Sequence, residues 1–452
     1  MIKYLSVFFI FFLLSSCSLD NKTGIWTKNQ KIKKENKTEV KEVEKNITEI
    51  SKSVENLKSE LNPNFEINLI TKPIKNSFIN KNDNNNGRIN YNGKLKSISK
   101  YKFSKIDNFY KFEPEIIFDT NNIIFFDNKG TILNFNNSSK LIWKRNFYNK
   151  SEKKLKPILF MAKEKKTLIV ADNLARYYGV DTETGALLWY KTNTAAFNSQ
   201  IKIYKDRFFV VDLDNVIRCY SIKDGSEIWN YQTEKAFIKS QKKMSIIVVK
   251  NRVFFNNSIG DITALDTRNG DLIWQTPTQS STIYGDVFKL KTSDLVANNG
   301  SIFFSNNQNE FYSLNIKNGL VNWKQKINSD LRSTIIDNII FTITLEGYLV
   351  VTNSESGKIL RITDLFHSFD KFYFLKKKGK KVNVRSSRKP EGFIVGTNNI
   401  YLTTNNGRLI VVSTKTGKIA SVLKIDKERI SRPFILNDNL YIIKNDSIIK
   451  LN

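Results

Sequence analysis

A β-strand unit that ends in Gly-x-x-x-Trp recurs along this sequence and constrains its fold more than any other feature. One copy runs from Arg252 to Pro277 and contains two short apolar strands, the tight turn Asn269-Gly270, and a third strand that carries Trp274. Asn-Gly between two β-rich runs predicts a type I′ hairpin turn, in which both residues have positive φ. One such meander would leave its edges exposed, so the repetition of the unit is the informative part.

The period of the repeat predicts a propeller. The tryptophans at the equivalent position are Trp143, Trp189, Trp229, Trp274 and Trp323. Successive tryptophans are 46, 40, 45 and 49 residues apart, and two later copies carry Arg361 and Ser421 instead. A period of about 40–50 residues with about four strands is typical of propeller blades. Because a single blade cannot bury both faces, we expect each indole to cover the seam with the neighbouring blade. Ordinary core tryptophans on unrelated strands would not fall at one point of a repeat.

The two ends of the chain are expected to build one blade together. The last repeat, from Arg432 to Asn452, supplies only three strands. Near the other end, Asn92-Gly93 is followed by KLKSISKYKF, which has the pattern of the turn and outer strand of a blade. We therefore predict that residues near 88–104 complete the last blade and remove its open edge. Seven complete copies and this composite predict an all-β fold over residues 88–452, a propeller of eight four-stranded antiparallel blades.

The first sixteen residues predict a lipoprotein signal peptide. Lys3 precedes the apolar run LSVFFIFFLL, which is too short for a transmembrane helix, and the following Leu-Ser-Ser-Cys has the pattern of a lipobox. Cys17 would then be the lipidated first residue of the mature protein, held on a membrane by acyl chains such as palmitate. Ser18 stands where an aspartate would signal retention in the inner membrane, so the outer membrane is favoured.

Residues 17–87 are predicted to be a lipidated tether, because they are rich in Lys, Asn, Glu and Ser. Within it, a heptad pattern predicts a helix over about 38–61, with apolar positions at Val40, Val43, Ile47, Ile50, Val54, Leu57 and Leu61. The helix could form a short coiled coil or bind a partner, or it could be a marginal amphipathic helix that rides on the propeller. Residues 80–88 are expected to form a polar linker.

The net charge limits the classes of partner that this protein could bind, and the cysteine content limits its disulfides. The formal net charge is +29, from 72 Lys and Arg against 43 Asp and Glu. Such an excess suits nucleic acid, anionic lipid or an acidic protein, and a signal peptide argues against nucleic acid. The densest basic stretch, 375–390, is an insertion in the seventh blade that could contact anionic headgroups or form a solvated hairpin. Cys219 is expected to be a buried thiol without a partner.

No catalytic constellation emerges from the sequence. The single histidine, His367, has no companion, and no spacing typical of metal ligands, nucleophile elbows or phosphate-binding loops occurs. Asp212 and Asp214 form the best carboxylate pair, which we interpret as a solvent-facing turn. We therefore expect no enzymatic activity, no metal and no cofactor.

With the lipobox and blades in place, the chain resembles the BamB family, the β-propeller lipoproteins of the outer-membrane β-barrel assembly machinery. The repeats GDITALDTRNGDLIW and RYYGVDTETGALLW are similar to the family's blade pattern, Leu-Asp-x-x-x-Gly-x-x-x-Trp. The resemblance implies a scaffold at the periplasmic face of the outer membrane. It would bind the POTRA domains of a BamA-like protein, together with other assembly-complex subunits, and aid insertion of β-barrel proteins.

The resemblance also implies contact residues, in loops 235–244 and 279–294. Ile238-Lys239 stands where the family has a leucine–arginine contact pair, and Phe237 precedes it in a loop otherwise rich in Lys and Gln. An exposed apolar anchor beside a cation suits a protein interface. Alternatively, Ile238 points inward as the first residue of an inner strand. The other functional hypothesis is a periplasmic ligand-binding propeller, or a degenerate quinoprotein-like one, with a small molecule over the central channel.

Overall fold

The computed structural model describes residues 18–19, 26–27, 59–75, 81–119, 122–234, 242–278, 290–367, 372–375, 380–383 and 387–452. The chain divides into two units, Met1–Val54 and Glu55–Asn452. In the first unit, β1 (Ser18–Leu19) pairs antiparallel with β2 (Trp26–Thr27). None of the helices in the described parts is both long enough and apolar enough to span a membrane. The predicted signal peptide, Cys17 and nearly all of the 38–61 helix lie outside the described residues.

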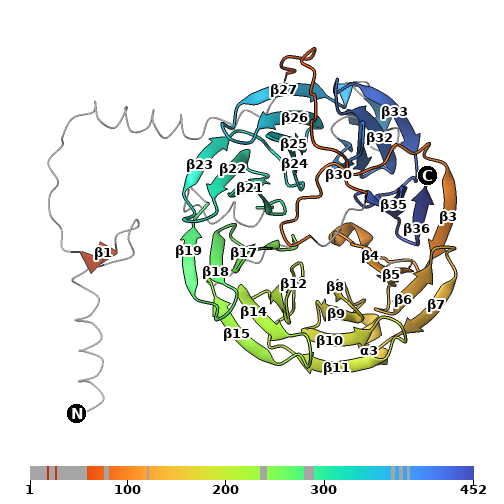
Figure 1. Cartoon of the computed structure of the whole chain (residues 1–452), viewed down its shortest axis with the longest axis vertical. Helices are drawn as coiled ribbons and strands as arrows, with labels where there is room; N and C mark the ends of the chain where they lie inside the picture. Colours follow the sequence, from red (N-terminus) through yellow and green to blue (C-terminus); the bar gives the residue numbers. More distant parts are fainter. Residues whose placement is uncertain are drawn as a thin grey trace, which may run out of the picture. The chain divides into compact units, whose positions relative to one another are not determined.

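The second unit contains eight four-stranded antiparallel sheets arranged as a ring, which confirms the eight-bladed propeller (Figure 1). Blade 1 is β4 (Ile117–Asp119), β5 (Asn122–Phe126), β6 (Ile132–Asn136) and β7 (Leu141–Arg145). Blade 2 is β8 (Leu159–Glu164), β9 (Thr167–Asp172), β10 (Arg176–Asp181) and β11 (Leu187–Thr192). Blade 3 is β12 (Lys202–Tyr204), β13 (Arg207–Val211), β14 (Val216–Ser221) and β15 (Glu227–Gln232). Blade 4 is β16 (Ile246–Val249), β17 (Arg252–Asn256), β18 (Ile262–Asp266) and β19 (Leu272–Thr276).

The remaining blades follow the same order from the channel outwards. Blade 5 is β20 (Val296–Asn298), β21 (Ser301–Asn306), β22 (Glu310–Asn315) and β23 (Val321–Gln325). Blade 6 is β24 (Thr334–Ile336), β25 (Ile339–Ile343), β26 (Tyr348–Asn353) and β27 (Ile359–Asp364). Blade 7 is β30 (Pro390–Val395), β31 (Asn399–Thr404), β32 (Arg408–Ser413) and β33 (Ile419–Lys424). Blade 8 is β34 (Phe434–Leu436), β35 (Asn439–Ile443), β36 (Ser447–Leu451) and, as its outer strand, β3 (Ser97–Lys102).

The last blade is built from both ends of the chain, as predicted. β3 pairs antiparallel with β36, with Tyr101 opposite Ile448. Tyr101 is fully buried, and its hydroxyl donates to the carbonyl of Asn137 in blade 1 at 3.2 Å. The closing strand therefore joins blade 8 to blade 1 by a side-chain hydrogen bond as well as by its backbone ladder.

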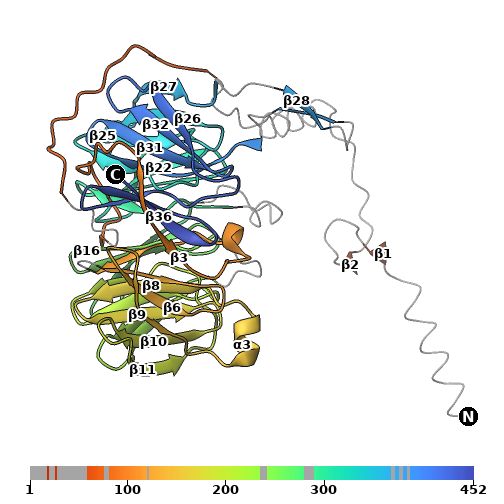
Figure 2. The same cartoon turned by 90° about the vertical axis from the view of Figure 1, so that its right-hand side faces the viewer.

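Short elements lie in the connections between blades. The 3-10 helix η1 (Phe109–Lys111) precedes blade 1, and α3 (Lys150–Lys154) precedes blade 2. β28 (Phe372–Leu375) and β29 (Lys380–Asn383) pair antiparallel within the basic insertion before blade 7, so this segment contains the hairpin that was expected. The side view shows α3 on one face of the ring and the orange segment of residues 59–75 along the other (Figure 2).

The core lies between blades. The second strand of each blade is a nearly continuous apolar run, such as NIIFF in β5, because both faces of the sheet are covered by neighbouring blades. Most of the outer strand is exposed instead: Leu141 and Ile142 of β7 are exposed, whereas Trp143 is buried. One core cluster joins Phe209 of blade 3 to Val253 of blade 4, which shows that this seam is an apolar interface.

Each tryptophan lies on the turn glycine of the next blade. A methyl carbon on Gly319 of blade 5 would lie 2.6 Å from the Trp274 ring of blade 4, so only glycine leaves room for the indole. The indole N–H donates across the same seam to the carbonyl of Ile316, at 3.3 Å. In the other four seams an indole N–H likewise donates to a backbone carbonyl of the next blade. The pairs are Trp143 with Thr182, Trp189 with Ile222, Trp229 with Thr267 and Trp323 with Ser354. The glycine and the tryptophan of the repeat thus belong to opposite sides of a seam.

The prediction of a type I′ turn at Asn269-Gly270 was wrong. Only Gly270 has positive φ, +79°, and the Asp266 N–H donates to the carbonyl of Asp271, so the turn is longer than two residues. The register between β18 and β19 also shifts between Ala264 and Leu265, as at a β-bulge. The longer turn is compatible with the glycine reaching the tryptophan of the preceding blade.

Candidate functional site

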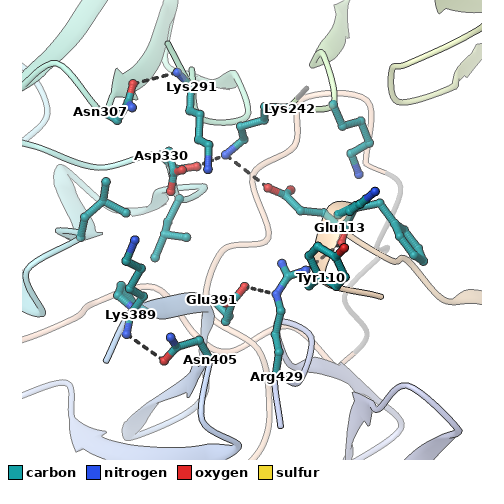
Figure 3. A pocket seen from close by; sticks show the side chains of 16 residues that line it. Tyr110, Glu113, Lys242, Lys291, Asn307, Asp330, Lys389, Glu391, Asn405 and Arg429 are labelled. Atoms are coloured by element: carbon teal, nitrogen blue, oxygen red, sulfur yellow. Dashed lines mark hydrogen bonds and ion pairs between the residues drawn. The ribbon is translucent and has the colours of Figure 1, made fainter. Parts of the chain in front are cut away.

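A cavity of about 670 Å³ opens at one end of the central channel, and we call it the channel cavity (Figure 3). Its wall is built by the segments that lead into the inner strands of several blades and by the turns between second and third strands. The basic side chains that line it are Lys111, Lys242, Lys243, Lys291, Lys389 and Arg429. The acidic ones are Glu113, Asp330 and Glu391. The end of the ring that carries this cavity is called the cavity face below.

Two carboxylates of the cavity wall are held in ion pairs. Glu113 lies 3.3 Å from the Lys242 ammonium, which also donates to the backbone carbonyl of Asp330. Burial lowers the pKa of Lys242, but the neighbouring acidic groups outweigh it, so the net pKa is raised and the ammonium is retained. Glu391 lies 2.6 Å from Nε of Arg429. Burial nevertheless raises the pKa of Glu391 overall.

An ionic layer lies next to the cavity, deeper in the channel. Glu115 lies 2.9 Å from Lys243, 3.1 Å from Arg432 and 3.7 Å from Arg332. Arg332 also donates through Nε to Asp294 at 2.7 Å. Burial opposes ionisation of Glu115, but the three cations prevail and lower its pKa to about 2. Glu115 is therefore ionised at neutral pH, and the ion pairs cross-link blades 1, 4, 5, 6 and 8.

The other end of the channel is filled by residues 81–87, which we call the channel plug. Asn84 is 1% exposed, and its amide nitrogen donates to the Gln200 side chain and to the carbonyl of Leu295. The carbonyl of Asn82 accepts from Val248 N–H of blade 4, and that of Asp83 accepts from Ala297 N–H of blade 5. The orange chain can be followed into the middle of the ring in Figure 1.

The prediction that residues 80–88 form a polar linker was wrong, because residues 81–87 form the channel plug. Asn85 exchanges two hydrogen bonds with the backbone of Ile335 in blade 6, and Ile89 donates to the carbonyl of Val395 in blade 7. The asparagine run is polar because it satisfies backbone groups of successive inner strands, not because it is solvated. Lys202 completes the plug by donating to the Asn84 side chain at 2.6 Å.

Three residues that were considered as site candidates from the sequence do not line the channel cavity: Asp212, Asp214 and His367. Asp212 is fully buried and accepts hydrogen bonds from the backbone of Asp214 and Val216 and from Arg218, so the prediction of a solvent-facing turn was wrong for Asp212. The carboxylate instead stabilises the turn between the second and third strands. His367 lines a separate cavity of about 470 Å³ near Glu60. Over the described ranges, no three His, Cys, Asp or Glu side chains are grouped to hold a metal ion.

The predicted contact residues Phe237, Ile238 and Lys239 lie outside the described residues. Their loop leaves after Glu234 and returns at Lys242, which lines the channel cavity. The second predicted contact loop leaves after Thr278 and returns at Leu290, beside Lys291 of the cavity wall. Both loops therefore begin and end on the cavity face.

The ionic layer was missed at the sequence level, although it leaves a pattern. Each of its five charged residues stands two or three positions before the inner strand of its blade: Glu115, Lys243, Asp294, Arg332 and Arg432. Each resembles an ordinary surface charge when its repeat is read alone. Aligning the repeats on their inner strands would have shown that all five point to one axis.

The ring of four-stranded blades, the glycine–tryptophan seams and the closing N-terminal strand define this chain as an eight-bladed β-propeller. The sequence profile of the family described as "Outer membrane protein assembly factor BamB" matches residues 128–363. This match covers more than half of the chain, so the chain belongs to the BamB family.

Solved structures agree on the fold. The crystal structure of BamB from Moraxella catarrhalis has a TM-score of 0.61 at 15% identity, covering 79% of this chain and 99% of that chain. The computationally designed Ika8 protein has a TM-score of 0.57 at 11% identity, covering 78% and 99%. The C-terminal WD40 domain of Sif2 has a TM-score of 0.57 at 11% identity, covering 81% and 99%. At these identities the likeness shows the fold alone. No curated protein sequence matches the chain.

Proposed function

We propose that this protein is a non-catalytic scaffold of outer-membrane protein assembly. It binds the periplasmic POTRA domains of a BamA-like protein through the cavity face and aids insertion of β-barrel proteins. Membership of the BamB family is the observation that carries this proposal. The ion pairs of the channel support a structural role, because Glu115 is bound by cations from three other blades, Lys243, Arg332 and Arg432.

The contact is proposed to lie in the loop 235–241 and its neighbour 279–289. The described chain resumes after these loops at Lys242 and at Leu290, which precedes Lys291, and both lysines line the cavity wall. Ile238 provides an apolar anchor and Lys239 an adjacent cation. This combination is typical of the few residues that carry most of the binding energy in a protein interface.

The protein is proposed to sit on the periplasmic face of the outer membrane through a lipid on Cys17. Each buried methylene of an acyl chain contributes about 0.8 kcal/mol to membrane binding, so two or more chains would hold the protein firmly. Cys17→Ala is expected to move the protein from the outer-membrane fraction to the soluble periplasmic fraction. Metabolic labelling with a palmitate analogue should label the wild type and leave this variant unlabelled.

Affinity capture tests the scaffold directly. Tagged full-length protein is purified from solubilised membranes, and the co-purifying proteins are identified. We expect a BamA-like protein with the wild type and a marked loss with Ile238→Asp/Lys239→Glu. The matched control is Ile228→Asp/Lys223→Glu, which makes the same chemical change on the outer part of blade 3, where Ile228 is 43% exposed. Absence of any outer-membrane assembly protein from the wild-type sample would contradict the proposal.

A further inference from the structure

The channel cavity has an excess of positive charge that the described residues do not neutralise. Six basic side chains line the cavity against three acidic ones. Lys242 and Arg429 are paired with Glu113 and Glu391. Lys243 is paired with Glu115 of the ionic layer. Lys111, Lys291 and Lys389, here called the rim lysines, have no carboxylate of a described residue within 4.0 Å, and all three are exposed.

Two of the rim lysines are held by equivalent contacts. The backbone N–H of Lys291 donates to the Asn307 side chain at 2.7 Å, and that of Lys389 donates to Asn405 at 2.9 Å. Figure 3 shows these two lysines on different sides of the cavity, each beside its asparagine. Their backbones are thus fixed while their ammonium groups remain available to a ligand.

An exposed aromatic ring adjoins the third rim lysine. Tyr110 is 65% exposed on the cavity wall, although its neighbour Phe109 is buried and fixes η1 to blade 1. The Lys111 ammonium lies 5.7 Å from the centre of the Tyr110 ring. Exposed tyrosine beside free cations is characteristic of protein interfaces, where tyrosine is over-represented among energetically important residues.

The cavity favours an acidic polypeptide over a small anion. The rim lysines offer flexible point charges that bind carboxylate or phosphate, and Arg429 of the wall already binds Glu391. A volume of about 670 Å³ exceeds what a single small anion needs. The channel plug closes the far end, so a polypeptide could enter only as a loop or terminus and could not thread through.

We propose that the channel cavity receives an acidic loop of the protein partner, whose Asp and Glu side chains bind the rim lysines. The proposal rests on the scaffold function above and names the chemistry of the partner's contact. The occupant is a loop because the cavity is blind, and it is acidic because the rim is cationic. It belongs to the same partner because the described chain resumes after the two predicted contact loops at Lys242 and beside Lys291, both of the cavity wall.

Binding of a labelled Asp/Glu peptide to the detergent-solubilised full chain tests the charge requirement. We expect saturable binding by fluorescence anisotropy, loss of about tenfold or more in affinity for Lys291→Glu/Lys389→Glu, and no binding of the corresponding Asn/Gln peptide. The control, Lys223→Glu/Lys317→Glu, makes the same charge change on exposed turns at the opposite face. Equal losses in both variants would mean non-specific attraction to a protein of charge +29 and would overturn the proposal.

Two further outcomes are decisive. Binding of free citrate with the same lysine dependence, without peptide binding, would make the cavity a small-anion site and also overturn the proposal. In membrane capture, the Lys291→Glu/Lys389→Glu variant should lose the BamA-like protein that the wild type retains. Retention of that protein by the variant would reject the acidic loop while leaving the scaffold function intact, whereas a wild type that captures no partner would reject the scaffold itself.

Discussion

The guanidinium of Arg361 in blade 6 lies against Gly417 of blade 7, in the place that a tryptophan occupies in the five preceding blades. A methyl carbon on Gly417 would lie 2.9 Å from Cζ of Arg361. Arg361 is fully buried and donates to the carbonyl of Thr414, the acceptor equivalent to those of the indoles. It also donates to the carbonyl of Phe65 in the N-terminal segment, at 2.9 Å. The missing tryptophan of this repeat is therefore replaced by a residue that binds both the seam and the N-terminal segment.

Replacing Arg361 should destabilise the propeller. Arg361→Met removes the donors to Thr414, Lys415 and Phe65, and leaving the buried carbonyl of Thr414 unsatisfied costs about 1–3 kcal/mol. Denaturant unfolding should show this loss. Arg361→Trp restores a donor at the seam and should lose less. A methionine variant as stable as the wild type would contradict the role of Arg361.

The tryptophan seam predicts a large effect of Trp274→Ala. The side chain is 8% exposed and packs on Gly319, so we expect a loss of about 3–5 kcal/mol in the free energy of unfolding. The control is Leu272→Ala on the same strand, where the side chain is 48% exposed and the effect should stay within about 0.5 kcal/mol. Similar losses in the two variants would show that the indole does not seal the seam.

Alanine variants of two glycines with similar backbone conformation should distinguish backbone strain from side-chain overpacking. Gly319 and Gly300 have φ of +72° and +80°, but a methyl group on Gly300 meets nothing within 4 Å, whereas one on Gly319 meets Trp274. Both alanine variants should lose about 1–2 kcal/mol from backbone strain. Gly319→Ala should lose about 1–3 kcal/mol more from overpacking. Equal unfolding free energies for the two variants would contradict the contact.

Stability should depend on pH through Lys202 in the plug. Burial, reinforced by Arg332, lowers the pKa of Lys202 to about 7 from an ordinary value of 10.5, although Glu115, Asp294 and Asp83 oppose the shift. Above pH 7 the folded amine is neutral while the unfolded one still binds a proton, so the free energy of unfolding should rise between pH 7 and pH 9. Lys202→Met should reduce this slope, as measured by urea unfolding at each pH. An unchanged slope would exclude Lys202 as its source.

The blades and their closure could be predicted from the sequence because they rest on local patterns. Apolar strand runs and the Gly-x-x-x-Trp spacing recur within each repeat, so a reader can count blades and find the missing outer strand at Ser97–Lys102. The detailed turn at Asn269-Gly270 was not predictable in the same way. A dipeptide indicates a hairpin, but the contact of Gly270 with Trp229 of the preceding blade is not visible in it.

The channel could not be predicted because its parts are far apart in the sequence. In the sequence Asn84 resembles a linker residue, because its hydrogen-bond partners Gln200, Ser245 and Leu295 lie more than 100 positions away. Likewise, Glu115 is an isolated carboxylate until the ring places cations from three other blades beside it. Only the closed ring creates these partners. The contact residues Phe237, Ile238 and Lys239 stay a prediction.

The claim that the cavity face meets the assembly partner is tested most directly by site-specific photo-crosslinking in membranes. A benzoylphenylalanine is placed at Tyr110 on the cavity wall, or at Lys250, in the turn between β16 and β17 at the opposite face. We predict a crosslink to the BamA-like protein from position 110 and none from position 250. A crosslink from position 250 with none from position 110 would contradict the account.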